Sequence, residues 1–345
     1  MRRLFALTVV GIVAASGLPS QGSQPVTGAK RAAADGGTAW KTPRTPWGHP
    51  DLQGIWTTDA EIGLPFERPE SFGERALMTD AEAAARDEQA RKRAAAPPRA
   101  GGTGAGPEHW YEGGEARSRR TSLVIDPPNG RIPPLTAEAE KRTIDPRTVL
   151  GFIPGIGSMG DGPFDGPEDL HLADRCITRG LPQTWVPSQY NNGFQIVQDG
   201  SFVSVLYERL HEARVIPLDG RGRLTPNIRQ WIGDSRGRWE GDTLVVDVTN
   251  FSNRTSYRSS GDTLRLVERY SRVGPNELRV EVTVTDPTTW TRPWTFAVTG
   301  KRDPSYWQIF EYACHEGNYG MTNILNGARV RERDGAGKAT RSQRP

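Results

Sequence analysis

Apolar and polar residues alternate along the second half of the chain, which is typical of strands with one buried face. The segment Glu277–Thr285 shows the pattern most clearly: leucine and valines occupy 278, 280, 282 and 284, and arginine, glutamate and threonines lie between and after them. Successive side chains of a strand point to opposite faces of the sheet. We therefore predict an antiparallel sheet with one buried and one solvated face.

Further segments with strand character follow at short intervals from Gly193 onward. They are 193–198, 202–208, 214–218, 243–249, 263–270, 277–285, 295–299 and 307–314. Turn residues separate them, and no helix-length segment intervenes. A long meander has two edges, and closure into a barrel removes them. We therefore predict an all-β fold, an antiparallel up-and-down β-barrel of calycin-like architecture with about eight strands. A two-sheet β-sandwich is the alternative.

The first residues have the pattern of an export signal. Arg2 and Arg3 precede an apolar run, Leu4–Ala15, that is too short to cross a bilayer about 30 Å thick. We predict an exported protein, periplasmic or extracellular, with an uncleaved membrane anchor as the alternative. The predicted organisation is a signal peptide over 1–23, a disordered linker over 24–44, an N-terminal extension over 45–115, the β-barrel domain over 116–333 and a frayed tail over 334–345.

The N-terminal extension contains one predicted helix, 80–96. Thr79 is a suitable N-cap, the helix is rich in Ala, Glu, Arg and Lys, and Pro97-Pro98 ends it. Its apolar face is mostly alanine, so the helix is expected to lie on the surface.

Charge and composition narrow the classes of partner. The 345 residues include 44 Lys and Arg and 41 Asp and Glu, a balance that gives no reason to expect a nucleic acid partner. No later stretch is apolar enough to span a membrane after signal removal. Gly and Pro, 39 and 27 residues, favour a loop-rich or all-β protein over a helical bundle.

Export makes the cysteine count informative. Cys176 and Cys314 are the only two cysteines, and an oxidising compartment would allow them to form a disulfide. In the chain-entropy model a bridge that closes so long a loop stabilises by about 4–5 kcal/mol. The alternative is a nucleophilic Cys314 beside His315, but neighbouring strand residues point to opposite faces, which makes such a dyad geometrically poor.

The stretch Trp231–Phe251 concentrates charged and aromatic residues. We predict a polar loop over 233–238 that leads through a turn into the strand 243–249. Two carboxylates in such a loop can serve as acid and base in glycoside cleavage, whereas turn formation and ion pairing are the structural alternative. A similar Gly-Asp-Thr-Leu sequence recurs at 261–264. The strand entry is therefore architecture, and any function is expected in the approach, at the mouth of the barrel.

Two sets of candidate residues follow from these patterns. Acid–base catalysis is assigned to Glu240, His211 and Glu208. Ligand binding through rings, amides and charges is assigned to Tyr190, Asn192, Asp234, Arg238, Trp239, Trp290 and Trp294. Each has a structural alternative: a surface histidine, an Asn-Asn-Gly turn, and tryptophans that plug the ends of a barrel.

Several chemistries have no motif in this chain. Histidine spacings typical of zinc sites are missing, as are the Gly-x-Ser-x-Gly elbow and a Gly-x-Gly-x-x-Gly sequence in a βαβ setting. We therefore predict no metal site and no cofactor.

Four motifs together resemble a known group of proteins. They are TPWGHPDLQGIW (45–56), DRC (174–176), GDSRGRWEGDTLVVDVTNF (233–251) and TVTDPTTWTRPWT (283–295). This combination resembles a large family of uncharacterised exported bacterial proteins with a GDSRGRWEGDTLVVDVTNF-type motif, over about 45–318. The resemblance implies export, a β-rich fold and a single module. It carries over no activity, cofactor or catalytic residue.

Three functions remain open from the sequence. The first is an exported β-barrel protein that binds a small molecule or glycan at the barrel mouth. The second is a cofactor-independent lyase or hydrolase that acts on a carbohydrate or phenolic substrate, and the third is a structural envelope protein with a filled barrel. An open lumen would favour the first two functions, and a filled lumen would favour the third.

Overall fold

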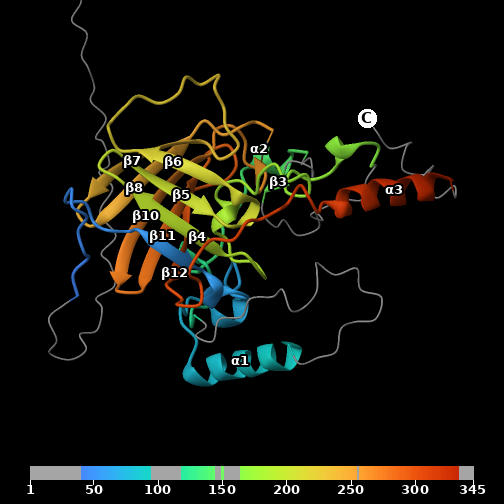
Figure 1. Ribbon diagram of the computed structural model, residues 1–345. Helices are drawn as coiled ribbons and strands as arrows, with labels where there is room; N and C mark the ends of the chain where they lie inside the picture. The colour runs from blue at the N-terminus through green and yellow to red at the C-terminus, as the bar shows by residue number, and fades with distance from the viewer. Residues whose placement is uncertain (1–39, 95–117, 144–148, 151–163, 255, 334–345) are drawn as a thin grey trace, which may run out of the picture. The chain divides into compact units, whose positions relative to one another are not determined.

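One antiparallel sheet forms the centre of the computed structural model, which describes residues 40–94, 118–143, 149–150, 164–254 and 256–333. Its strands follow the order β6-β5-β4-β1-β12-β11-β10-β8-β7, and β2 pairs with β12 (Figure 1). The strands are β1 (Gly54–Thr57), β2 (Val124–Asp126), β4 (Gly193–Gln198), β5 (Phe202–Tyr207), β6 (Ala213–Pro217), β7 (Asp234–Glu240), β8 (Thr243–Thr249), β10 (Arg265–Gly274), β11 (Glu277–Thr285) and β12 (Trp294–Lys301).

Short elements surround the sheet. Outside it, β3 (Val149–Leu150) and β9 (Ser256–Tyr257) form a parallel pair. The helices are α1 (Asp80–Ala94), α2 (Ala137–Glu140) and α3 (Tyr319–Arg333), and the 3-10 turns are η1 (Asp59–Glu61), η2 (Glu70–Phe72), η4 (Pro167–Asp169), η5 (Gln183–Trp185) and η6 (Arg209–His211). Within the described residues, no helix has the length and apolar character needed to cross a membrane. The predicted signal peptide, most of the predicted linker and the predicted tail lie outside the described residues.

The predicted antiparallel all-β meander is confirmed, and its strongest strand patterns are found at the predicted residues. The segments 193–198, 243–249 and 277–285 are β4, β8 and β11. Leu278, Val280, Val282 and Val284 of β11 are each 0% exposed. Period-two alternation therefore determined which face of this strand is buried.

The sheet curves but is not closed by hydrogen bonds. β6 and β7 stand at the two ends of the strand order and meet through side chains. A Cβ added to Gly237 of β7 would lie 2.8 Å from Cγ2 of Ile216 on β6, and the Arg214 guanidinium donates to the Ser235 hydroxyl at 3.3 Å. Glycine at 237 permits this close approach. The barrel edges thus meet without a continuous ladder.

Two predictions about secondary structure are wrong. The segment 233–238 is not a loop: all of it but Gly233 belongs to β7, which pairs with β8 from Asp234 opposite Thr249 to Glu240 opposite Thr243. The tight Gly241-Asp242 turn holds these strands in register, although β7 lacks an apolar alternation. The segment 307–314 is not a strand. It follows β12, whose sides already pair with β11, β1 and β2, so no free edge remains beside it.

Two regular elements were not expected. β1 pairs with both β4 and β12 and so joins the two halves of the sheet, although its residues belong to the segment predicted as an extension. Helix α3 packs Met321, Ile324, Leu325 and Ala328 against Phe164 and Leu170 in a small separate cluster. The predicted helix 80–96 is confirmed as α1 over 80–94, and 95–96 lie outside the described residues; Thr79 and Glu82 form reciprocal hydrogen bonds at its start.

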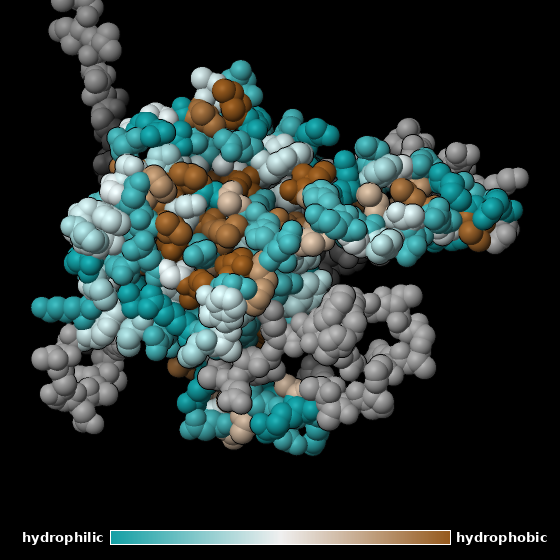
Figure 2. Space-filling view, viewed as in Figure 1, coloured by the Kyte–Doolittle hydropathy of each residue, from teal (hydrophilic) through white to brown (hydrophobic). Residues whose placement is uncertain are grey.

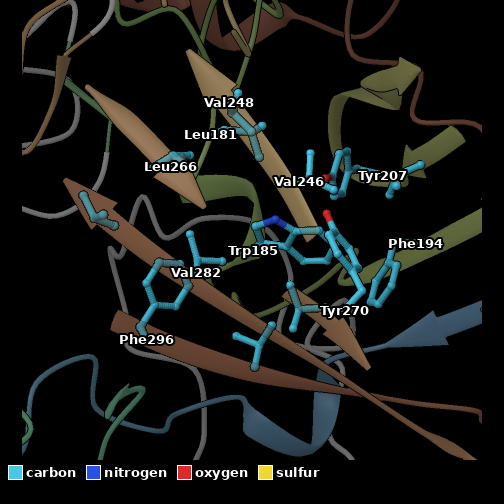
Figure 3. Packing of buried hydrophobic residues seen from close by; sticks show 14 of the residues in the cluster. Leu181, Trp185, Phe194, Tyr207, Val246, Val248, Leu266, Tyr270, Val282 and Phe296 are labelled. Atoms are coloured by element: carbon cyan, nitrogen blue, oxygen red, sulfur yellow. The ribbon is translucent and has the colours of Figure 1, made fainter. Parts of the chain in front are cut away.

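Side chains fill the interior of the curved sheet. One cluster of buried residues includes side chains from β1, β4, β5, β6, β8, β10, β11 and β12. Figure 3 shows Trp185, which comes from η5 outside the sheet, among Phe194, Tyr207 and Tyr270. Its ring centroid lies 5.1 Å from that of Phe194 and 5.0 Å from that of Tyr207. A ligand would have to displace this core to enter the lumen.

The outer face of the sheet is partly apolar over β4 to β6. Val197 and Val215 are 47% and 59% exposed. Figure 2 shows apolar side chains gathered on this side of the molecule.

Candidate functional site

A surface pocket of about 670 Å³ lies beside the start of β4. Its lining comes from two places: the residues just before β4, and the segment between β12 and α3. The lining residues are Tyr190, Asn191, Glu311, Tyr312, Ala313, Cys314, Gly317 and Asn318. We call it the Tyr190–Tyr312 pocket.

A disulfide holds one wall of this pocket. Cys176 and Cys314 are bonded, with Cα atoms 5.8 Å apart, which confirms the predicted bridge. Asn318 donates to the carbonyl of Asp174 at 2.7 Å beside it. The segment 311–318 is therefore tied to the segment around Cys176, and Cys314 has no free thiol to act as a nucleophile.

Two arginines lie behind the aromatic lining. The Arg209 guanidinium stands 4.6 Å from the centroid of the Tyr190 ring and donates to the Ser188 hydroxyl. Arg179 donates to the same hydroxyl at 3.5 Å and to the carbonyl of Val186 at 3.2 Å. Within the described part of the chain, neither guanidinium forms an ion pair with a carboxylate.

The electrostatic environment of Arg179 is unfavourable for its charge. Burial, and after it the positive charge of Arg209, lowers the pKa of Arg179. A desolvated cation without a counter-ion is costly, and a bound anion would remove that cost. The pair is therefore suited to an anionic group.

One carboxylate approaches the pair without neutralising it. Glu212 accepts from the Thr178 hydroxyl, and at 3.4 Å from the backbone N–H of Arg179. Burial raises the pKa of Glu212. Its charge also acts on Arg179, but within the described part of the chain it forms no direct ion pair with the guanidinium.

The catalytic candidates Glu208 and His211 do not line this pocket, and they do not form a catalytic group. Glu208 is 2% exposed and accepts from the Tyr306 phenol, and from the backbone N–H of Gly193 at 3.3 Å. His211 is exposed, and its Nδ1 accepts from the backbone N–H of Tyr312 at 3.2 Å. Glu208 and His211 thus have different partners and form no acid–base pair.

The Asn192 side chain takes part in hydrogen bonds within the protein. Its Oδ1 accepts from the backbone N–H of Ser188 at 2.7 Å, and its Nδ2 donates to Asp59 at 2.9 Å. Of the sequence candidates, Tyr190 alone is among the residues that line the pocket.

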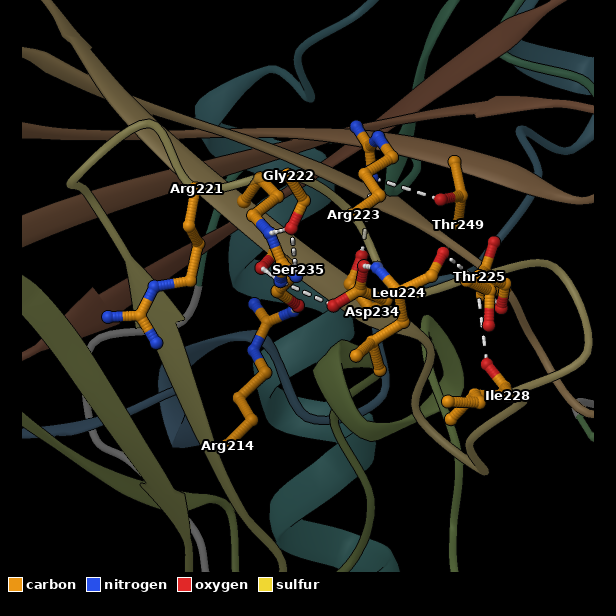
Figure 4. Close-up of polar contacts among 12 residues, drawn as sticks. Arg214, Arg221, Gly222, Arg223, Leu224, Thr225, Ile228, Asp234, Ser235 and Thr249 are labelled. Atoms are coloured by element: carbon orange, nitrogen blue, oxygen red, sulfur yellow. Dashed lines mark hydrogen bonds and ion pairs between the residues drawn. The ribbon is translucent and has the colours of Figure 1, made fainter.

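The candidates on β7 lie elsewhere, and their contacts are structural. Asp234 is 4% exposed and accepts from the backbone N–H of Leu224 at 3.0 Å, as Figure 4 shows. Glu240 is exposed and accepts from Arg238 at 2.8 Å and from Arg269 at 2.9 Å. The hydrogen bond from Arg269 is the main cause that lowers the pKa of Glu240. A carboxylate held ionised by two cations is a poor general acid.

The three tryptophan candidates belong to the packed protein. Trp290 and Trp294 are 3% and 0% exposed and pack edge to face with centroids 5.5 Å apart. Trp239 is half-buried, 5.4 Å from the ring of His49. The buried rings of Trp290 and Trp294 offer no face to a ligand.

Sequence reasoning missed Arg179, Arg209 and Tyr312. Their positions in the sequence lie far apart and share no motif. The predicted disulfide was the one sequence feature that could have indicated their proximity, because Arg179 follows Cys176 by three positions and Tyr312 precedes Cys314 by two.

Among the described residues, no three His, Cys, Asp or Glu side chains converge to hold a metal ion.

Comparisons with known proteins add little to this geometry. No protein-family model matches the chain, and no curated protein sequence matches it. Among solved structures, a mutant of the fluorescent protein UnaG aligns with 14% sequence identity and a TM-score of 0.22, over 38% of this chain and 85% of that chain. A TM-score this low does not establish a common fold.

Proposed function

We propose that this protein is exported and binds a small organic anion in the Tyr190–Tyr312 pocket. The observation that carries the proposal is the pair Arg179 and Arg209, which share one hydroxyl and have no ion-paired carboxylate among the described residues. Arginine suits carboxylate and phosphate groups because its donors form a planar fork.

The aromatic lining supports an organic anion over an inorganic one. Tyr190 and Tyr312 offer ring faces beside the guanidinium groups. A small-molecule site commonly combines apolar and aromatic surface with a few placed polar groups. An aromatic carboxylate or sulfonate would match both the rings of the lining and the arginines behind them. Export is supported by the signal-like N-terminus and by the disulfide.

Calorimetric titration of the full chain with 4-hydroxybenzoate and benzenesulfonate tests the proposal. The matched neutral ligand is 4-hydroxybenzamide. We expect the anions to bind and Arg179→Gln or Arg209→Gln to weaken binding by roughly 10-fold or more, because a hydrogen bond to a charged group contributes about 1.5–3 kcal/mol. Arg238→Gln, on the exposed face of β7, is the control and should bind as the parent does. Equal binding of the amide, or no effect of the two arginine variants, would contradict the proposal.

A structural role in the envelope is the second candidate. The filled interior of the sheet favours it, because no ligand needs to enter the barrel. If the anions give no heat of binding and do not shift the melting temperature, the structural role is favoured over anion binding. No comparable observation favours a lyase or hydrolase, since Glu208, His211 and Glu240 are not brought together.

A further inference from the structure

A second surface pocket lies on the opposite end of the segment that follows β12. Its volume is about 610 Å³, and β1, β4, the turn between β10 and β11, and the residues after β12 contribute to it. The lining residues are Gly54, Ile55, Gln195, Asn276, Arg302, Asp303, Pro304, Tyr306 and Trp307. We call it the Trp307 pocket.

An exposed indole forms one wall of the Trp307 pocket. Trp307 is 69% exposed, whereas Trp185, Trp290 and Trp294 are buried. Phe310 packs edge to face against it, with ring centroids 6.1 Å apart. An exposed ring of this size does not contribute the free energy that its burial in the core would give. Exposed aromatic rings are typical of surfaces that contact another molecule.

Free hydrogen-bonding groups accompany this ring. Within the described part of the chain, the side-chain amides of Gln195 and Asn276 form no hydrogen bond to protein. Arg302 donates through one nitrogen to the carbonyl of Gln53 at 2.6 Å and lies 4.6 Å from the centroid of Trp56. Its remaining N–H groups are available to a ligand. The pocket therefore offers donors and acceptors next to an apolar face.

The segment that carries Trp307 is anchored at the preceding residue. The Tyr306 phenol donates to buried Glu208, and the Tyr306 ring packs directly on Gly193 of β4. A Cβ added to Gly193 would lie 2.5 Å from Cε1 of Tyr306. Asp303 further fixes the turn by accepting from the backbone N–H of Ser305 at 2.8 Å. A wall held in place before binding loses less entropy when a ligand arrives.

We propose that the Trp307 pocket binds a pyranose unit of a glycan. The apolar C–H face of a pyranose ring stacks on an indole, and its vicinal hydroxyls both donate and accept, as amide groups do. The polar side chains here are two neutral amides, one guanidinium and the Asp303 carboxylate, which accepts from Ser305. The Tyr190–Tyr312 pocket instead has two guanidinium groups behind its aromatic lining, so the two sites take different ligands.

Titration of the full chain with the hexaoses of glucose, xylose and N-acetylglucosamine tests this site, read by tryptophan fluorescence and calorimetry. We expect at least one hexaose to bind. Trp307→Ala should lower the affinity for that hexaose by roughly 10-fold, and Asn276→Ala should lower it by a smaller factor. Tyr319→Ala removes a ring that is 75% exposed outside both pockets and is the matched control. Circular dichroism establishes that each variant is folded.

The two sites are distinguished by crossing ligands and variants. Arg209→Gln should bind the hexaose as the parent does, and Trp307→Ala should bind benzenesulfonate as the parent does. Lack of binding by all three hexaoses, or equal hexaose binding by the parent and Trp307→Ala, would overturn the glycan site whatever the fate of the anion site. Hexaose binding that is lost in Arg209→Gln but kept in Trp307→Ala would also overturn it.

Discussion

The indole Nε1 of Trp185 donates to Oε1 of Glu268 at 3.0 Å inside the curved sheet. Glu268 lies on β10 and is 0% exposed. Its other carboxylate oxygen accepts from the Arg214 guanidinium of β6, and from the Tyr270 phenol at 2.9 Å. A residue from a connecting turn thus completes the coordination of a buried ion pair between two strands. Buried charges persist where such hydrogen bonds satisfy them.

Replacement of Trp185 tests this arrangement. Trp185→Phe removes a donor from Glu268 and leaves space in the core. We expect the free energy of unfolding to fall by roughly 2–4 kcal/mol. Urea denaturation measures the free energy of unfolding. Trp47→Phe is the control, because the Trp47 ring is 39% exposed. A loss below about 1 kcal/mol would show that the hydrogen bond and the ring packing contribute little there.

The ion pair of Arg214 and Glu268 should behave as a unit. Arg214→Met leaves an uncompensated buried carboxylate, so we expect a loss of about 3–5 kcal/mol in the free energy of unfolding. Arg214→Met combined with Glu268→Leu should cost much less than the sum of the single changes, because no charge then remains buried. A double-mutant cycle in urea measures the coupling. Additive costs would mean that the two side chains stabilise the fold independently.

The disulfide should support both the fold and the anion pocket. Cys176→Ser with Cys314→Ser removes the tether of the segment that carries Tyr312. For a loop of this length we expect a loss of about 4–5 kcal/mol in the chain-entropy model. Binding of benzenesulfonate should weaken as well, because the pocket wall loses its fixed position. Dithiothreitol should reproduce both effects in the parent and change nothing further in the double variant; an unchanged affinity after reduction would contradict the role in the pocket.

Glu240 and His211 should differ in their effect on ligand binding. Glu240 lies at the end of β7 and contacts Arg238 and Arg269, away from both pockets. Glu240→Gln should leave binding unchanged and cost at most about 1 kcal/mol, as surface ion pairs do. His211→Ala removes the acceptor for the backbone N–H of Tyr312 and should weaken anion binding a few-fold. Titration of both variants with benzenesulfonate compares them, and the reverse order would contradict the assignment of the site.

Anion binding should strengthen as the pH falls. Burial raises the pKa of Glu212, so this carboxylate takes up its proton at a higher pH than an exposed glutamate. Protonation removes a negative charge that acts on Arg179 and favours an anion there. Because its pKa is raised on folding, Glu212 binds its proton more tightly in the folded state than in the unfolded state. Its contribution to the free energy of unfolding is therefore present at low pH and is lost as the pH rises through the raised pKa.

Titration with benzenesulfonate at several pH values between 7.5 and 5 measures this effect, because the ligand keeps its charge over that range. Glu212→Gln should show a flatter dependence than the parent. The other titratable groups that face the site are Arg179, Tyr190, Arg209, His211, Glu311 and Tyr312. His211→Ala separates the contribution of the histidine, and equal pH profiles for the parent and Glu212→Gln would exclude Glu212 as the cause.

Local pattern was enough for much of the sheet but for little of the site. The side chains of Asn192 and Asp234 accept from backbone N–H groups, and Trp290 and Trp294 are buried in the core. In each case the residue type was compatible with both function and architecture. Only its partners in space distinguish the two.

The sequence by itself determined the antiparallel meander, the buried face of β11, the capped helix α1 and the pairing of Cys176 with Cys314. The strands and the helix follow from alternation, turn residues and capping, which are local patterns. The disulfide follows from the cysteine count, because two cysteines allow only one intramolecular pairing. The tertiary structure decided that β7 is a strand, that 307–314 has no edge to pair with, and that Arg179 meets Arg209. Free strand edges and missing counter-ions depend on contacts between distant residues, and no local pattern encodes them.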